Sequence, residues 1–192
     1  SYVWNSVIAD VVTAGGGSIF VKGDFNIGSY IIQIPTSAEE VYLRITGEAM
    51  RANIITGTGA KMFDYLGTDF TNKRSLVLEY IQFNHAVPDN DAVTLDLTYL
   101  QAARLVQVRC YNTNNDRKGT AIKGGPTANA HPSPTFEDVL AQSYNTSFNI
   151  DWDHFVGINM VTGNSLRPFY IHNNYHTTLI NPHVYQESMA GA

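Results

Sequence analysis

The chain has 192 residues, which is enough for one domain with a sizeable hydrophobic core. Hydrophobic residues make up 44% of it and charged residues only 15%, and this composition excludes a disordered, highly charged chain. The formal net charge of −5 disfavours contact with a phosphate backbone, so we expect no nucleic-acid partner.

The first element expected is a short helix over residues 2–13, because its apolar side chains recur at helical spacing on one face. Three glycines at 15–17 end this helix. Short strands follow. They are expected at 18–21, in the region 25–34 where Gly28 interrupts the pattern, at 41–45 and at 53–55.

The rest of the chain repeats a unit of two short strands without helical periodicity. Its clearest copy is 93–97 followed by 105–111, with a corner at 99–104, and both strands alternate apolar and polar residues. Three further copies pair 62–66 with 76–84, 148–152 with 156–164, and 169–173 with 179–185. A unit that recurs roughly every 20 to 35 residues is typical of a solenoid, whose rungs stack around one core.

The N-terminal pattern resembles that of pectate-lyase-like right-handed parallel β-helix proteins, a group that includes polysaccharide lyases, glycosidases and bacteriophage tailspikes. The residues that carry the resemblance lie at 7–12, 15–21, 28–34 and 41–55, and the later repeats extend it to most of the chain. One departure is the turn after the first strand, where the group's usual Pro-x-Gly-x-Tyr is replaced by Val-Lys-Gly-Asp-Phe. The resemblance implies an all-β fold: a right-handed parallel β-helix with a short N-terminal capping helix, in a single domain over residues 1–192.

The same resemblance implies a function at an extracellular or virion surface. The protein is expected to bind polysaccharide and, if it is an enzyme, to be a polysaccharide lyase or a glycoside hydrolase. The alternative is a non-catalytic structural or assembly module of a virion or cell-surface protein. A homo-oligomer is expected, with the trimer as the form known for spikes of this type.

The two ends of the chain suggest a piece of a longer protein. It begins without Met and without a signal peptide, and no apolar run has the length of a membrane span, so we expect no membrane partner. The last expected rung ends near residue 185 without a capping helix. An open β-helix end exposes core side chains and strand edges, so we expect another subunit or a further domain to cover it.

Outward-facing polar residues supply the candidates for catalysis. Stacking the repeats places Asp96, Asp151 and His172 at corresponding outward positions, and Asp151 shares a strand face with Asp153. Carboxylates about 5 to 9 Å apart can hydrolyse glycosides by acid–base chemistry. Arg109 is a candidate because arginines polarise a uronate or abstract a proton in lyases of the group. The alternative for all four catalytic candidates is a solvated or ion-paired surface.

The candidates for binding sugar are side chains with rings, because rings can stack on sugar faces. They are His154, His172, Tyr99, Tyr144 and Tyr170. The alternative for aromatic residues is packing in the core, and Trp152 in particular is expected to point inward, away from the carboxylates that flank it.

Cys110 is the single cysteine, so no internal disulfide is expected, and we predict that it is a small buried residue. No metal site is expected from the histidines, because the segment between His172 and His176 is not helical. Ca²⁺ is left open, since it prefers oxygen ligands and two runs are rich in them. These residues are Asp89, Asn90 and Asp91 in one run and Asn114, Asn115 and Asp116 in the other. The alternative is that both runs only make turns.

The two oxygen-rich runs lie in polar excursions at 86–91 and 113–134, and the second brackets a strand expected at 120–123. Insertions in a solenoid fall at the corners of its rungs, often on the binding side.

Overall fold

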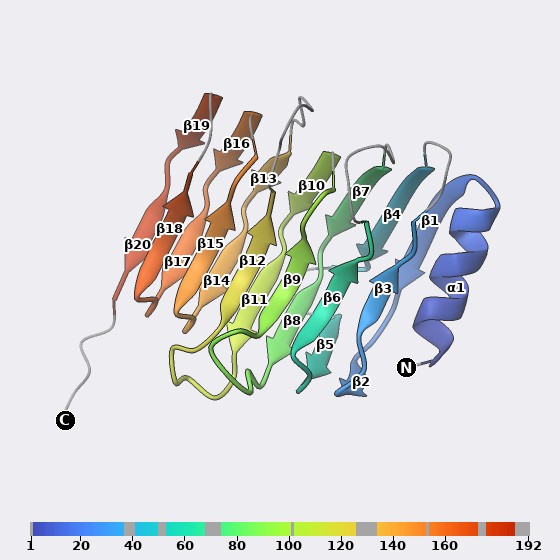
Figure 1. Cartoon of the computed structure of the whole chain (residues 1–192), viewed down its shortest axis with the longest axis horizontal. Helices are drawn as coiled ribbons and strands as arrows, with labels where there is room; N and C mark the ends of the chain where they lie inside the picture. Colours follow the sequence, from blue (N-terminus) through green and yellow to red (C-terminus); the bar gives the residue numbers. More distant parts are fainter. Residues whose placement is uncertain are drawn as a thin grey trace.

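The structure is a computed structural model that describes residues 2–36, 41–49, 53–67, 74–100, 102–125, 134–152, 154–172 and 176–186. It is a right-handed parallel β-helix (Figure 1). Helix α1 (Tyr2–Thr13) comes first, and the strands that follow form three sheets in which every described pair of neighbours is parallel. The predicted fold class is therefore confirmed, including the helix at the start. No described helix has the length and apolar character needed to cross a membrane.

Each of the first six rungs gives one strand to each sheet, in the order A, B, C, and the described part of the seventh rung gives strands to sheets A and B. Sheet A consists of β1 (Gly16–Val21), β4 (Val41–Gly47), β7 (Arg74–Glu79), β10 (Ala102–Val106), β13 (Thr135–Glu137), β16 (His154–Ile158) and β19 (His176–Ile180). Sheet B consists of β2 (Phe25–Gly28), β5 (Ile54–Gly57), β8 (Gln82–His85), β11 (Arg109–Asn112), β14 (Leu140–Gln142), β17 (Val161–Gly163) and β20 (His183–Tyr185). Sheet C consists of β3 (Ile32–Ile34), β6 (Lys61–Tyr65), β9 (Val93–Leu97), β12 (Thr120–Gly124), β15 (Thr146–Ile150) and β18 (Arg167–Ile171).

The core consists of columns of apolar side chains that run along the stack, because equivalent positions of successive rungs are in register. One column of sheet C contains Ile32, Phe63, Leu95, Ile122, Phe148 and Phe169. Its last two rings stack with their centroids 5.3 Å apart. Each fully buried side chain of this size contributes roughly 1.5–3 kcal/mol, so the columns supply the main stabilisation of the fold.

The turn between sheets A and B has only two residues in the last five rungs. The first of the two has a positive φ each time, and these residues are Tyr80, Gln107, Asp138, Asn159 and Asn181, with φ between 49° and 58°. The backbone N–H of Tyr80 donates to the carbonyl of Val106 in the next rung, and Gln107 repeats this bond to Glu137. The turn therefore continues the ladder of backbone hydrogen bonds around the corner.

This turn corrects four predicted strands. The segments 76–84, 105–111, 156–164 and 179–185 are each two strands, one in sheet A and one in sheet B, and not one. The corner residue is usually polar and lies between apolar neighbours, so it reads in the sequence as one more outward residue of a continuous strand. A single left-handed residue leaves no signal in a period-two pattern.

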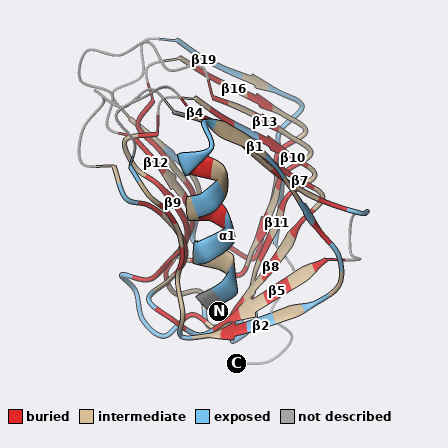
Figure 2. Ribbon diagram, turned by 90° about the vertical axis from the view of Figure 1, so that its right-hand side faces the viewer, coloured by how far each residue is buried: buried red, intermediate tan, exposed pale blue. Residues whose placement is uncertain are grey.

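The two ends of the stack differ. Helix α1 lies across the first rung, where it contacts β1, β3 and β4 and buries Ile8 completely (Figure 2). The side-chain oxygen of Asn5 accepts a hydrogen bond from the backbone N–H of Gln33 at 2.9 Å, which ties the helix to β3. At the other end, no described element covers β18, β19 and β20. Val184 therefore has 53% of its surface exposed, although Thr162, its neighbour in the same inner column, is buried.

Candidate functional site

The outer face of sheet B carries two adjoining hollows of about 460 and 400 Å³. Arg109 lines both of them, so they form one groove that we call the B-face groove. Gln82, Asn84, Tyr111, Asn112, Thr113, Asn115, Gln142, Ser143 and Asn164 also line the first hollow, and Gln107, Asp138, Leu140, Asn159, Val161, Asn181 and His183 also line the second. Apart from Arg109, the first hollow is lined by uncharged residues.

Strand alternation puts these side chains on the surface. On β11, Arg109 and Tyr111 point outward, whereas Cys110 between them is completely buried, as the sequence predicts. The parallel register pairs Gln82 with Arg109 and Asn84 with Tyr111 on the neighbouring strand. Successive rungs are about 4.8 Å apart, so the groove is a ladder of side chains at a fixed repeat along the stack.

Hydrogen bonds hold several groove side chains in place. The amide of Gln82 donates to the side-chain oxygen of Asn84 at 2.8 Å, and the guanidinium of Arg109 donates to the hydroxyl of Tyr111 at 3.4 Å. Amides present both donors and acceptors, and tyrosine presents a ring face with a polar tip. This combination suits a ligand with many hydroxyl groups and apolar ring faces.

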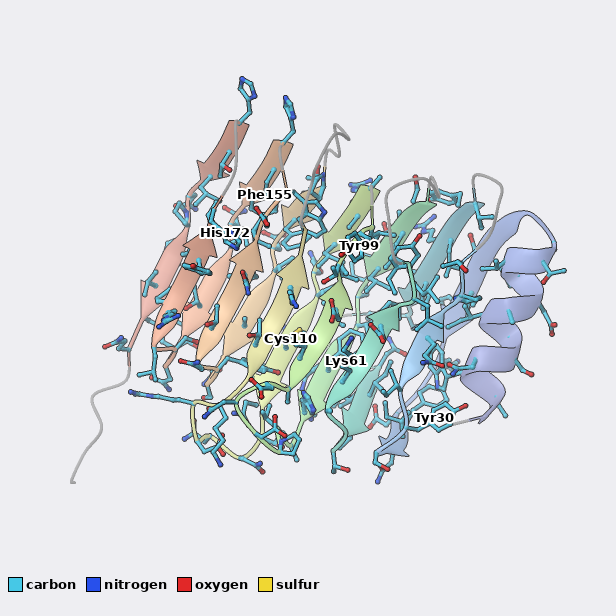
Figure 3. All side chains as sticks on the ribbon, in the orientation of Figure 1. Tyr30, Lys61, Tyr99, Cys110, Phe155 and His172 are labelled. Atoms are coloured by element: carbon cyan, nitrogen blue, oxygen red, sulfur yellow. The ribbon has the colours of Figure 1, made fainter. Side chains whose placement is uncertain are left out.

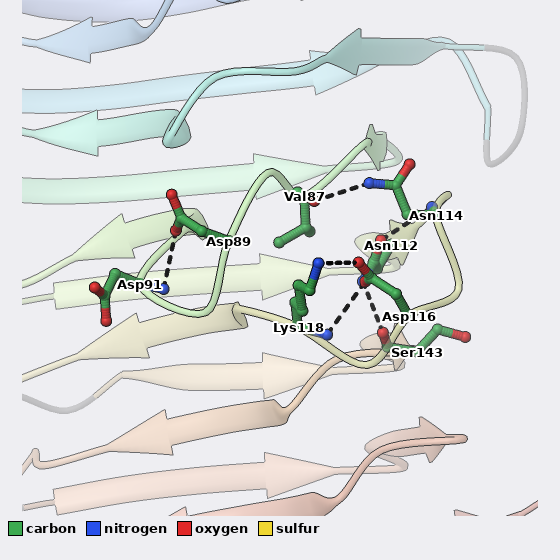
Figure 4. Close-up of polar contacts among 8 residues, drawn as sticks. All are labelled: Val87, Asp89, Asp91, Asn112, Asn114, Asp116, Lys118 and Ser143. Atoms are coloured by element: carbon green, nitrogen blue, oxygen red, sulfur yellow. Dashed lines mark hydrogen bonds and ion pairs between the residues drawn. The ribbon is translucent and has the colours of Figure 1, made fainter.

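Two long turns between sheets B and C lie side by side in neighbouring rungs (Figure 4), and the second of them forms one rim of the groove, because Thr113 and Asn115 line the first hollow. The two turns cover residues 86–92 and 113–119. The side-chain amide of Asn112 donates to the carbonyl of Ser143 at 2.9 Å and to the carboxylate of Asp116 at 2.8 Å. The amide of Asn114 donates to the carbonyl of Val87 at 2.8 Å, which ties the two turns together.

The oxygen atoms considered for Ca²⁺ take part in these turns. Asp89 accepts a hydrogen bond from the backbone N–H of Asp91, and Asp116 accepts one from the backbone N–H of Lys118 and pairs with its ammonium group at 3.0 Å. Burial opposes ionisation of Asp116, but the bonds from Asn112 and Lys118 outweigh it and lower the pKa of this carboxyl group. Within the described residues, no group of three or more His, Cys, Asp or Glu side chains could hold a metal ion. Ca²⁺ binding therefore stays open, and hydrogen bonds within the protein already hold the two turns in place.

Asp96 lies on the outer face of sheet C and not in the B-face groove. The ammonium group of Lys61 is 2.8 Å from one oxygen of Asp96 and 2.9 Å from an oxygen of Asp64, so it joins carboxylates on neighbouring strands. The backbone N–H and the hydroxyl group of Thr98 donate to the other oxygen of Asp96. Burial alone would raise the pKa of Asp96, but the bonds from Lys61 and Thr98 hold it below its usual value. Sequence reasoning missed both Lys61 and Asp64.

The predicted alignment of Asp96 with Asp151 and His172 is wrong by two residues. In the register of sheet C, Asp96 lines up with Lys123, Asn149 and Tyr170. A shift of two residues keeps every side chain on the same face of its strand, so apolar–polar alternation cannot distinguish the two alignments. As predicted, strand β12 lies between β9 and β15.

Asp151 and His172 do come together, near the C-terminal rungs. The nitrogen Nδ1 of His172 is 3.5 Å from a carboxylate oxygen of Asp151, and the ring of Tyr170 lies 4.8 Å from the imidazole. Several strands separate this cluster from Lys61 (Figure 3). Asp153 lies outside the described residues.

The remaining ring candidates are scattered. His154 lies on sheet A, where its imidazole stacks on that of His176 with centroids 4.6 Å apart. Tyr99 is half-buried against the core, in the turn after β9. Tyr144 is completely buried and its hydroxyl is 2.7 Å from that of Thr94, so this ring is not presented to a ligand at the surface. Trp152 is buried as predicted, and its indole N–H donates to the carbonyl of Leu100 at 3.0 Å.

Among the predicted site residues that the structure describes, only Arg109 lines the B-face groove. The sequence does contain a signal for groove residues that were not predicted. Gln-x-Asn at 82–84 and Arg-x-Tyr at 109–111 each place two polar side chains on one face of a strand, in consecutive rungs. The signal becomes visible only when β8 and β11 are separated from the strands of sheet A that precede them.

Comparisons of the chain with protein-family models, with curated proteins and with solved structures find no match. The parallel β-helix therefore rests on the strand register of this chain and not on a relative.

Proposed function

We propose that the protein binds a polysaccharide along the outer face of sheet B. The observation that carries the proposal is the pair of hollows of about 460 and 400 Å³ that meet at Arg109. Together they give an elongated, amide-rich surface whose side chains repeat with each rung. A polymer of sugar units can meet such a repeat with one contact after another, whereas a small ligand uses only part of it.

The chemistry of the lining supports a sugar over other polymers. The hydroxyl groups of a saccharide find donors and acceptors on Gln82, Asn84 and Gln142, and the ring of Tyr111 offers a stacking face. A nucleic acid needs a basic surface, but Arg109 is the single cation among the residues that line the groove and the net charge of the chain is −5.

The resemblance to pectate-lyase-like proteins, bacteriophage tailspikes among them, supports the same function. With it we propose an extracellular or virion-surface location and a homo-oligomeric, trimeric assembly. Cleavage by a lyase or hydrolase reaction is the further step that an assay for new reducing ends detects.

A second candidate function is a non-catalytic structural or assembly module. The last rung favours it, because no described element covers this rung and Ile180 and Val184 each have about half of their surface exposed. A structural module does not need the groove side chains to contact a sugar, so groove variants separate the two candidates.

The test is a glycan array with the wild type, followed by titration of each bound glycan against two tyrosine variants. Tyr111→Ala removes a ring from the groove, and Tyr42→Ala removes an exposed ring from the outer face of sheet A. We expect Tyr111→Ala to weaken binding about tenfold, which corresponds to roughly 1.4 kcal/mol, and Tyr42→Ala to bind like the wild type.

The proposal fails if no glycan binds across a diverse array, or if the two tyrosine variants bind alike. In the first case the structural module is the better reading. Thermal unfolding of both variants shows that a loss of binding is not a loss of fold.

A further inference from the structure

A chain of hydrogen bonds crosses the interior beside the rim of the B-face groove. The nitrogen Nε2 of His85 is 2.7 Å from the carbonyl oxygen of Gly59, and its Nδ1 is 2.9 Å from the hydroxyl oxygen of Thr94. That hydroxyl oxygen is in turn 2.7 Å from the hydroxyl oxygen of Tyr144. The three side chains have no exposed surface. The chain thus joins turns that belong to the second and the fifth rung.

Each group in this chain has one possible role. A carbonyl oxygen only accepts, so Nε2 of His85 carries the hydrogen. Neutral imidazole has one N–H, so Nδ1 accepts from the hydroxyl of Thr94, and the oxygen of Thr94 accepts from the hydroxyl of Tyr144. A second proton on His85 would make Nδ1 a donor to the oxygen of Thr94, and one of the two hydroxyl hydrogens, that of Thr94 or that of Tyr144, would then have no acceptor within this chain of hydrogen bonds.

The surroundings of His85 favour the neutral ring. Burial lowers the pKa of His85, while the bond to the carbonyl of Gly59 and the exposed carboxylate of Asp89 act in the opposite direction and are outweighed. Of the other titratable groups near the chain, Tyr144 and Cys110 both have a pKa raised by burial and stay uncharged.

The chain of hydrogen bonds is connected to the groove at two points, at His85 and beside Tyr144. The carbonyl of His85 accepts from the backbone N–H of Thr113, the first residue of the rim turn. Next to Tyr144, the carbonyl of Ser143 accepts from Asn112 and the hydroxyl of Ser143 donates to Asn115. Thr113, Asn112, Asn115 and Ser143 all line the first hollow.

We propose that His85 is a pH-sensitive latch: its neutral ring holds Thr94 and Tyr144 and thereby orders the rim at residues 112–119, and its protonation releases that rim. Release of the rim lowers saccharide affinity, and this last step rests on the proposed function. The sign follows from linkage. The unfolded chain takes up a proton near pH 6.5 that the folded chain resists, so the stability that neutral His85 contributes is complete above about pH 6.5 and falls as the pH decreases.

The test uses the wild-type chain and two histidine variants. His85→Gln keeps one donor for the carbonyl of Gly59 and one acceptor for Thr94 but cannot be protonated near neutral pH. His176→Gln changes an exposed histidine on β19 and serves as the control. Hydrogen exchange of residues 112–119 is measured at pH 7.5 and 5.0 and corrected for the intrinsic pH dependence of exchange.

We expect exchange in this segment to rise at least fivefold at pH 5.0 in the wild type and in His176→Gln, and to stay constant in His85→Gln. Imidazole NMR of the wild type gives a second readout, in which His85 is the Nε2–H tautomer with a pKa below the usual value for histidine of about 6.5. The proposal is overturned by equal pH responses of the two variants, by a rim that does not respond in the wild type, or by the Nδ1–H tautomer. If His85→Gln does not fold, the proposal is judged from the wild type alone, by the response of its rim to pH and by the tautomer and pKa of His85.

Neither measurement needs a sugar, so this proposal and the proposed function fail separately. If the rim opens in acid but the protein binds no glycan, the proposal for His85 is supported and the proposed saccharide function is rejected. A rim that opens in acid while glycan affinity stays constant rejects the link between them.

Discussion

Lys61 shows how one side chain can support two carboxylates, one buried and one partly buried. Asp96 has only 5% of its surface exposed, and a carboxylate at that depth needs several hydrogen bonds to stay ionised. Lys61 supplies one of them, and the two carboxylates that it contacts raise the pKa of Lys61 against the effect of burial. Both oxygens of Asp96 are engaged by Lys61 and Thr98, which makes this cluster a stabilising ion-pair network on sheet C.

We expect Lys61→Met to lower the free energy of unfolding by about 2 kcal/mol at pH 7, the usual worth of a hydrogen bond to a charged group. Because the pKa of Asp96 is lowered in the folded protein, the stability tied to its ionised form is complete above about pH 3.9 and falls as the pH decreases. Urea unfolding of both proteins from pH 7 to pH 3 measures the difference, which should shrink in acid.

Lys22→Met is the matched control, because Lys22 is exposed and its pair with Glu48 spans 3.7 Å. Exposed pairs contribute roughly 0–1 kcal/mol. Equal losses for the two lysine variants would show that the Lys61 cluster stabilises nothing.

The two-residue turn between sheets A and B sets the geometry of each of the last five rungs. Its corner residues also bond to one another. The amide of Asn181 donates to the side-chain oxygen of Asn159 at 3.0 Å, and the amide of Asn159 donates to Asp138 at 2.9 Å. Asparagine tolerates a positive φ better than most residues do, so these side chains serve both the backbone conformation and the contact between rungs.

Replacing Asn159 separates the two contributions. Asn159→Ala loses both side-chain bonds and places an ordinary Cβ at φ 49°, and we expect it to cost about 2 kcal/mol. Asn159→Gly loses the same bonds but adopts this φ freely, so its loss should be about 1 kcal/mol smaller. Denaturant unfolding measures both. A glycine variant as unstable as the alanine variant would mean that the positive φ costs nothing here.

At the scale of the whole molecule, each rung contacts the rungs before and after it, as in other solenoids. Stability in such a fold is close to a sum of rung and interface contributions. The first rung has α1 on its outer side, whereas the last has no described cover. The two terminal rungs should therefore differ in local stability although both are at an end.

Hydrogen exchange along the chain checks this asymmetry. We expect the lowest protection in β19 and β20, the highest in β7 to β11, and an intermediate level in β1 and β3 under the helix. Equal protection of β1 and β19 would show that α1 does not stabilise the rung that it covers.

The helix at the start and the burial of Cys110 and Trp152 could be predicted from the sequence, because alternation and helical spacing depend only on nearby residues. The fold class followed from the recurring strand unit together with the resemblance of the N-terminal pattern to pectate-lyase-like β-helix proteins. The corners at Tyr80 and Gln107 could not, since one left-handed residue does not disturb the alternation. The register that pairs Asp96 with Lys123 and the approach of Lys61 to Asp96 both depend on loop lengths, which set how rungs align. The B-face groove was hidden because the corners at Tyr80 and Gln107 separate β8 and β11 from the strands of sheet A before them, and these corners leave no signal in the alternation.

The A–B turn keeps a length of two residues through the last five rungs, and this has a consequence for how such a molecule can grow. Phe136 pairs with Gly157, 21 positions further along the chain, and the two-residue turns at Asp138 and Asn159 both begin with a residue of positive φ. A tandem duplication of that segment would insert a complete extra coil that meets both neighbours through contacts already in use. Genetic lengthening by whole coils, in steps of about 4.8 Å, would then extend the outer face of sheet B without redesigning any part of it.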